Sequence, residues 1–408
     1  MTLDLLGILE NAHAPLHLGW RVVVENAAVS RQSFAIDADG HVLEPPDLWE
    51  KNLPKKLRDQ AMRVVWNEEH QREELAVEGR IVLHRGVVGL GLAGRAFEDF
   101  KEFGKGIRYT SLTPAGFEPK ARIEEHKKHR IDAAVLYPSV GLFLEAIRNP
   151  QLAAMHCRIY NDWIADYCSY DPERLIGVAA VPMQDVDEAV KEVTRAVRDL
   201  GLRGAFVRPN PCNGRHLDSP DFDPLWDALQ ELGVPVALHP SGTPDLWGAC
   251  SLFRDYSRSI HAFQHSMNFS FDDEFAFSLL VGSGVLERFP RLKVAILESG
   301  GGWIPHWFDR MDHFHDVWRW TTKHLSLKPS EYFKRQAYIS FDPDERSLPA
   351  VIDIVGKDRI IWASDFPHLD VTSDCIGRDV RENLKALSPK AQKLILSENA
   401  KSLYGLWN

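Results

Sequence analysis

Short apolar segments that alternate with amphipathic stretches are the feature that most constrains the fold of this chain. The first segment starts near Ser33 and ends at Asp39 and His41, and seven others follow at Ala133–Tyr137, Ile176–Val181, Gly204–Val207, Val234–Leu238, Lys293–Leu297, Ala337–Ile339 and Arg359–Ala363. The stretches between them, such as Asp185–Leu202 and Phe222–Leu232, carry apolar residues at helical spacing. Strands that alternate with helices in this way predict an α/β fold, here a closed (β/α)8 barrel of the TIM type.

The last of these strands ends in a polar sequence. Residues 359–368 read Arg-Ile-Ile-Trp-Ala-Ser-Asp-Phe-Pro-His, so that an apolar run delivers Asp365 to the C-terminal end of a buried strand. Barrel enzymes keep their catalytic residues at this end of the strands. Taken alone, Asp365 could equally be a turn residue or a helix N-cap.

Polar residues at other strand ends change that balance. They are Asp39 and His41 on the first strand, Arg208 on the fourth, His239 on the fifth, Glu298 on the sixth and Asp365 on the eighth. Each has a structural alternative: His239 could be a turn residue before Pro240, Glu298 a helix cap, and Arg208 a partner of Asp37. Together, two imidazoles and two or three carboxylates at one barrel mouth predict a bound cation.

Two segments do not follow the strand–helix alternation. Residues 1–32 show no clear period and are interpreted as an N-terminal extension to a domain of residues 33–408. Residues 46–124 are irregular, with helical material over Asp47–Asn67 and a glycine-broken hairpin over Ile81–Leu90. Because a simple βα loop is much shorter, this stretch is predicted to be an insertion after strand one that covers the active site and selects the substrate.

Charge and composition exclude several classes of partner. The net charge is −10, and the basic residues form no stripe, which argues against nucleic acid. No apolar run approaches the roughly 20 residues of a membrane span, and no glycine-rich nucleotide fingerprint follows a strand. The five cysteines are far apart, as in a reduced cytoplasmic protein. We therefore expect a cytoplasmic protein with a small-molecule substrate.

Four motifs together resemble the amidohydrolase-related family, often called amidohydrolase family 2. They are the Asp-x-Asp-x-His-x-x-Glu-Pro opening at residues 37–45, Leu238-His239-Pro240, the Glu298-Ser-Gly-Gly-Gly-Trp-Ile-Pro segment, and Ser364-Asp365-Phe-Pro-His368. The resemblance extends over about residues 33–404. The family contains aminocarboxymuconate-semialdehyde decarboxylase, γ-resorcylate decarboxylase and related hydrolases, and it implies a metal-dependent (β/α)8 enzyme.

The resemblance also implies a ligand set. Asp39, His41, His239 and Asp365 would hold one divalent metal, which could be Zn, Mn or Fe. Glu298 stands where many members of the family have a histidine, and this departure weakens any direct transfer of a decarboxylase mechanism.

The charge on Glu298 leaves two alternatives. Asp39 and Asp365 already neutralise one divalent ion, so an ionised Glu298 beside them would leave a buried negative charge. Either Glu298 holds a proton and acts as a general acid, or a second metal is present. His261 and His265, four residues apart on one predicted helix face, could bind that second metal, although such a pair is more often an ordinary helix face.

These residues favour a metal-dependent hydrolase or decarboxylase for a small carboxylated or amide substrate, with non-oxidative decarboxylation first. Asp365 would move the proton, Glu298 would assist, and Arg208 would clamp a substrate carboxylate. A dinuclear Mn or Fe oxygenase on the same barrel is one alternative, and a catalytically silent subunit of a hetero-oligomer is another. We expect a homo-oligomer, with a hetero-oligomer as the alternative.

Overall fold

The structure is a computed structural model. It describes residues 33–93, 105–243, 246–253, 261–369, 371 and 373–407, except for the side chains of residues 261 and 262. The predicted N-terminal extension, residues 1–32, lies outside this part of the chain. Among the helices that the structure describes, none is long and apolar enough to cross a membrane.

Every predicted barrel strand is present, the third of them as two short strands. The parallel strands are β1 (Ile36–Val42), β5 (Ala133–Pro138), β6 (Leu175–Gly177), β7 (Ala179–Ala180), β8 (Ala205–Val207), β9 (Val236–Leu238), β10 (Val294–Ile296), β11 (Ala337–Phe341) and β12 (Ile360–Trp362). All of their residues are buried, as expected for parallel strands with both faces covered. The predicted α/β class with parallel strands is therefore confirmed.

The parallel strands of the described chain form two sheets. One has the order β1-β5-β6, and the other has the order β12-β11-β10-β9-β8-β7. Only Val178 separates β6 from β7, and its N–H donates to the carbonyl of Leu136. At the other junction the N–H of His41 donates to the carbonyl of Phe366 at 2.7 Å, just beyond β12. Closure of the two sheets into one barrel remains a prediction.

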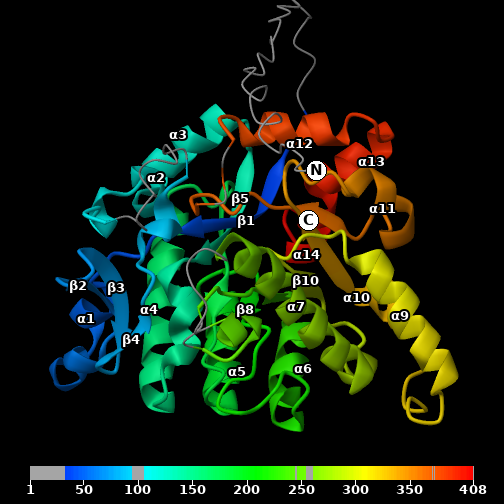
Figure 1. The fold of residues 1–408 in the computed structure, drawn as a ribbon, viewed down its shortest axis with the longest axis horizontal. Helices are drawn as coiled ribbons and strands as arrows, with labels where there is room; N and C mark the ends of the chain where they lie inside the picture. The colour runs from blue at the N-terminus through cyan, green and yellow to red at the C-terminus, as the bar shows by residue number, and fades with distance from the viewer. Residues whose placement is uncertain are drawn as a thin grey trace, which may run out of the picture. The chain divides into compact units, whose positions relative to one another are not determined.

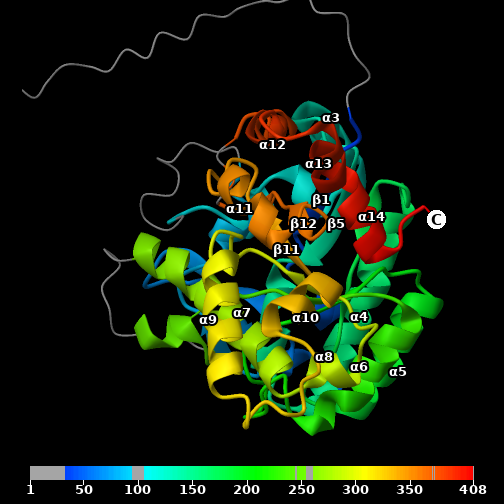
Figure 2. The ribbon, with the colours of Figure 1, turned by 90° about the vertical axis from the view of Figure 1, so that its right-hand side faces the viewer.

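Helices follow most of these strands and cover the outside of the sheets (Figures 1 and 2). The α-helices are α1 (Leu48–Asn52), α2 (Pro114–Phe117), α3 (Pro119–His129), α4 (Pro150–Ser169), α5 (Val186–Arg198), α6 (Asp223–Leu232), α7 (His261–Gly282), α8 (Val285–Arg288), α9 (Ile304–Val317), α10 (Pro329–Gln336), α11 (Leu348–Val355), α12 (Ile376–Leu384), α13 (Pro389–Lys393) and α14 (Asn399–Tyr404). Neighbours in sequence pack on each other, as α4 does on α5 and α5 on α6. The predicted helices at 185–202 and 222–232 are α5 and α6.

The segment between β1 and β5 contains a separate antiparallel sheet, which Figure 1 shows beside α1 and α4. Its strands are β2 (Arg63–Asn67), β3 (Arg72–Val77) and β4 (Arg80–Leu83). Two details of the prediction were wrong. Residues 63–67 are a strand and not a helix, because Val64, Val65 and Trp66 favour an extended backbone. The hairpin turns at Glu78-Gly79, where both residues have positive φ, and not within residues 81–90.

Candidate metal centre

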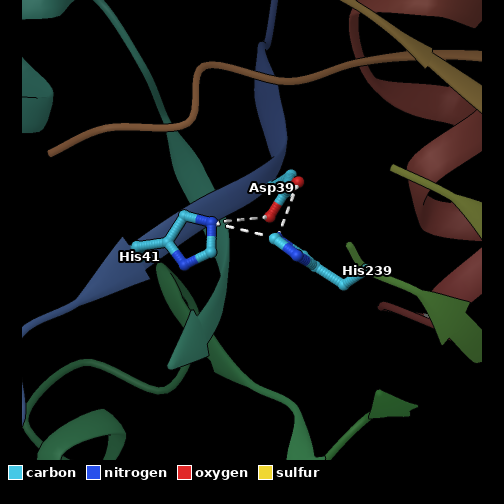
Figure 3. Close-up of side chains that lie close together, drawn as sticks. All are labelled: Asp39, His41 and His239. Atoms are coloured by element: carbon cyan, nitrogen blue, oxygen red, sulfur yellow. Dashed lines mark hydrogen bonds and ion pairs between the residues drawn. The ribbon is translucent and has the colours of Figure 1, made fainter. Parts of the chain in front are cut away.

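Asp39 and His41 lie on β1 and point to the same side, where they meet His239 from the residue after β9 (Figure 3). The Nε2 atom of His41 lies 3.4 Å from Oδ1 of Asp39, and Nε2 of His239 lies 3.4 Å from Oδ2 of Asp39. All three side chains are buried, and they form a group whose candidate ligand atoms lie within 4.8 Å of one another. The structure thus brings together three of the predicted ligands.

The two imidazoles of this group face each other through their Nε2 atoms. Nδ1 of His41 lies 2.7 Å from the carbonyl of Pro138, and Nδ1 of His239 lies 2.9 Å from the carbonyl of Pro240. A carbonyl oxygen can only accept, so each Nδ1 donates a proton, and in this tautomer the ring has its lone pair on Nε2. The two Nε2 atoms are 3.1 Å apart. Two lone pairs at this separation repel unless a cation lies between them.

The carboxylate of Asp39 points to the same conclusion. It is buried, and neither of its oxygens accepts a hydrogen bond from the residues that the structure describes. A buried carboxylate without hydrogen bonds is costly, and a divalent ion is the usual compensation. The donor set of two imidazoles and carboxylate oxygens therefore fits a divalent metal of the Zn, Mn or Fe type.

Asp365 lies in the segment that follows β12, and its side chain contacts this group. Its Oδ1 atom lies 3.1 Å from Nε2 of His41, and its backbone N–H donates to the carbonyl of Asp39 at 2.9 Å. The φ angle of Asp365 is +58°, a conformation that favours glycine, and such strain is common at functional sites. Burial raises the pKa of Asp365, but His368 and His41 outweigh burial, so the pKa lies below its usual value and the group is ionised.

Asp37, the first residue of the opening motif, holds the turn that carries Asp365. Its carboxylate accepts hydrogen bonds from the backbone N–H of Ser364 at 2.9 Å and from the Ser364 hydroxyl at 2.5 Å. Burial raises the pKa of Asp37 to about 7, although these hydrogen bonds and the charge of Arg122 act in the opposite direction. Sequence reasoning had considered Asp37 only as a partner of Arg208.

Three residues that contact the site were not predicted as site residues. Arg122 on α3 is fully buried and donates to the carbonyls of His41, at 2.5 Å, and Phe366, at 3.3 Å. Glu44, the last acid of the opening motif, accepts the backbone N–H groups of residues 139–141 after β5. His368 contacts Asp365 directly. The motifs contained Glu44 and His368, whereas nothing in the sequence indicated Arg122.

Glu298 follows β10 and lies on the far side of His239 from Asp39. Its Oε2 atom is 3.5 Å from Nδ1 of His239, and its φ angle of +54° repeats the strained conformation of Asp365. Within the described chain, the groups of converging ligand atoms do not include Glu298. Both alternatives for Glu298, an acid beside a metal ligand or a ligand of a second metal, stay predictions.

This arrangement predicts the outcome of replacing Glu298 by glutamine. We expect Glu298→Gln to keep the metal content and the fold and to lower turnover by about 10²–10⁴-fold, the usual contribution of a general acid. Metal analysis beside rate measurement distinguishes the alternatives. Loss of one of two metal equivalents would instead identify Glu298 as a ligand of a second ion.

The structure places Arg208 in a different environment from the predicted clamp. Its guanidinium donates to Asn210 at 2.8 Å and lies 3.9 Å from the carboxylate of Glu145, which is itself buried. Burial raises the pKa of Glu145 to about 7, and the charge of Arg208 partly offsets this. Arg208 thus faces Glu145, whereas the carboxylate of Asp37 accepts hydrogen bonds from Ser364.

A cavity of about 710 Å³ opens beside Asp365. Glu298, Ser364 and Asp365 line it from the strand ends, and His265 of α7 lines it as well. His265 also packs edge-on against Phe269, with ring centroids 4.6 Å apart, and it belongs to none of the converging ligand groups of the described chain. The side chain of His261 lies outside the described residues, so the predicted pair remains a prediction.

Comparison with known proteins agrees with this geometry. Residues 36–406 match the family model described as Amidohydrolase. A 2-amino-3-carboxymuconate-6-semialdehyde decarboxylase from Dictyostelium discoideum is 25% identical over 71% of this chain and 77% of its own length. A gamma-resorcylate decarboxylase from Polaromonas sp. strain JS666 is 29% identical over 70% of this chain and 86% of its own length.

A solved structure agrees with the fold. It is that of a dihydroxybenzoic acid decarboxylase from Polaromonas sp. JS666 with bound manganese and the inhibitor 2-nitroresorcinol. It superposes with a TM-score of 0.65 at 21% identity and covers 92% of this chain and 98% of its own. These relatives confirm the predicted enzyme class, a metal-dependent hydrolase or decarboxylase. With a family model that matches nearly its whole length and the ligand geometry described above, the chain belongs to the amidohydrolase family.

Proposed function

We propose that this chain is a metal-dependent, non-oxidative decarboxylase of a small hydroxylated aromatic carboxylic acid. The observation that carries the proposal is the pair of Nε2 atoms of His41 and His239, 3.1 Å apart and flanked by Asp39 and by Asp365, which lines a cavity. Relatives with this fold that are named for their activity include decarboxylases of dihydroxybenzoic and resorcylic acids, which supports this substrate class.

In this proposal the two parallel sheets are parts of one (β/α)8 barrel, and the site holds one metal, with manganese as the first candidate. The hydrogen bonds between β1 and the segment after β12 support the barrel, and the manganese in the related structure supports the metal. The residues between β1 and β5 would cover the site, since the N–H of Leu369 donates to the carbonyl of Gly89 in that segment. The cytoplasmic location and the oligomeric state stay predictions.

Asp365 and Arg208 each have a definite part in this proposal, and Glu298, 3.5 Å from His239, would assist as an acid. When bound, the metal would act as a Lewis acid toward the carboxylate and a neighbouring hydroxyl of the substrate. The Asp365 carboxylate would take a proton from a substrate hydroxyl or water and pass it to the ring carbon. The carbon–carbon bond breaks, CO₂ leaves, its bonding electrons stay on the ring carbon, and the proton forms the new C–H bond. To clamp the substrate, the guanidinium of Arg208 would have to leave the carboxylate of Glu145 and bind the carboxylate of the substrate.

The test is a substrate panel with the metal-loaded protein. We expect release of CO₂ and of the matching phenol from hydroxybenzoates such as 2,6-dihydroxybenzoate. In D₂O the product should carry one deuterium at the carbon that lost the carboxylate. Turnover should stop after metal removal and return with Mn²⁺. Hydrolysis of an amide panel without any decarboxylation would overturn the proposal in favour of a hydrolase. The comparisons offer no support for an oxygenase or a silent subunit.

A further inference from the structure

His368, which the roles above leave unused, is held by three contacts. Its Nδ1 atom lies 2.7 Å from Oδ1 of Asp365, and its Nε2 atom lies 2.9 Å from the hydroxyl of Ser139. Its ring stacks on that of His41 at a centroid distance of 3.9 Å and an interplanar angle of 24°. The side chain is also buried, so burial and these three contacts together fix the position of the ring.

These contacts exclude His368 as a metal ligand, although it lies in a group with His41 and Asp365 whose ligand atoms come within 4.8 Å of each other. A metal needs a free lone pair on a ring nitrogen, and metal–nitrogen distances are about 2.0–2.1 Å. Nδ1 lies 2.7 Å from Oδ1 of the Asp365 carboxylate, which leaves no room for an ion between the two atoms. Nε2 is engaged by Ser139. His41 can therefore serve as a metal ligand and His368 cannot, although the two rings stack.

The contact with Asp365 matters because of how that residue is held. Its backbone has the strained φ of +58°, and its side chain must point Oδ1 toward His41 to reach a shared metal. A donor on Nδ1 of His368 fixes the rotation of this carboxylate. The other end of His368 is anchored to the β5 loop, because Glu44 binds the N–H groups of Val140 at 2.9 Å and Gly141 at 2.8 Å beside Ser139.

We propose that His368 is a positioning residue that orients the carboxylate of Asp365 toward the metal by a hydrogen bond from Nδ1, with Ser139 as its outer anchor. The inference rests on the proposed metal site but not on the reaction assigned to it. Partners that orient a metal ligand in this way typically contribute 10–100-fold to metal affinity.

Two amide substitutions separate the two ends of the imidazole. The amide nitrogen of asparagine overlays Nδ1 of histidine, whereas that of glutamine overlays Nε2. We expect His368→Gln to weaken Mn²⁺ binding by about 10–100-fold, because the donor to Asp365 is lost. We expect His368→Asn to stay within about threefold of the native affinity. Binding is measured by titration with Mn²⁺ alone and the electron paramagnetic resonance signal of the free ion, so no substrate is needed.

His156→Gln is the matched control, since His156 is equally buried and also bonds at both nitrogens, to Leu152 and Met62. It should lower the melting temperature without changing Mn²⁺ affinity. Equal Mn²⁺ affinity in the native, His368→Gln and His368→Asn proteins would overturn the proposal. If the Gln variant does not fold, a folded His368→Asn protein with tenfold weaker binding overturns it as well. Absence of Mn²⁺ binding by the native protein would overturn the metal site and this inference together, whereas native binding without decarboxylation would overturn only the reaction.

Discussion

His239→Ala is expected to abolish tight binding of divalent metal and, with it, catalytic turnover. The substitution removes one of the two facing Nε2 atoms and leaves His41 and the carboxylates with an incomplete set of ligands. A ligand at 100 times its dissociation constant stabilises a protein by about 2.7 kcal/mol. The native protein should therefore melt higher with Mn²⁺ than without, and His239→Ala should show no such shift.

Metal-free proteins give the complementary result. Without metal, the two Nε2 lone pairs repel each other in the native protein but not in His239→Ala. Metal-free His239→Ala should therefore lose no more stability, relative to the native apoprotein, than the packing of the missing ring contributes. Elemental analysis and thermal melts with and without Mn²⁺ measure both effects. His315→Ala on α9, a buried histidine outside the ligand groups, is the control and should keep its metal. Full metal content in His239→Ala would show that the cluster is a hydrogen-bond network.

Arg122→Met should lower the free energy of unfolding by about 3–5 kcal/mol, the usual effect of removing one partner from a buried charged network. The guanidinium donates to the carbonyl of His41, the carbonyl of Phe366 and Nε2 of His126, and all of these acceptors are buried. Methionine fills similar space but donates nothing, so the acceptors lose their hydrogen bonds. Asp37 also loses the cation that opposes the rise of its pKa.

Urea denaturation measures this change, and Arg381→Met is its matched control. Arg381 also donates to two backbone carbonyls, those of Arg130 and Gly377, but in a more exposed setting. The control should cost only about 1 kcal/mol, since water can replace its hydrogen bonds. An Arg122→Met protein as stable as the control would show that the buried carbonyls find other donors.

The site residues on regular strands could be predicted because the signals that mark them are local. Apolar runs gave the strand positions, and the polar residue after each run gave Asp39, His41, His239, Glu298 and Asp365. Parallel strands bring their C-terminal ends to one edge, so residues far apart in sequence were expected to lie close together. The errors fell in the segment between β1 and β5, where residues 63–67 form a strand and the hairpin turns at Glu78-Gly79, because short β elements depend on their neighbours.

The sequence alone therefore determined which residues stand at the strand ends, and the tertiary structure decided what holds them there. Arg122 acts on the carbonyl of a residue 81 positions away, and Ser139 meets His368 across 229 positions. No periodicity relates such pairs, since they meet only when separate strand–helix units pack together. The orientation of each imidazole likewise depends on carbonyls of Pro138 and Pro240 that folding places against Nδ1. The local sequence marks the candidate ligands, whereas contacts between distant segments set the orientation of their side chains.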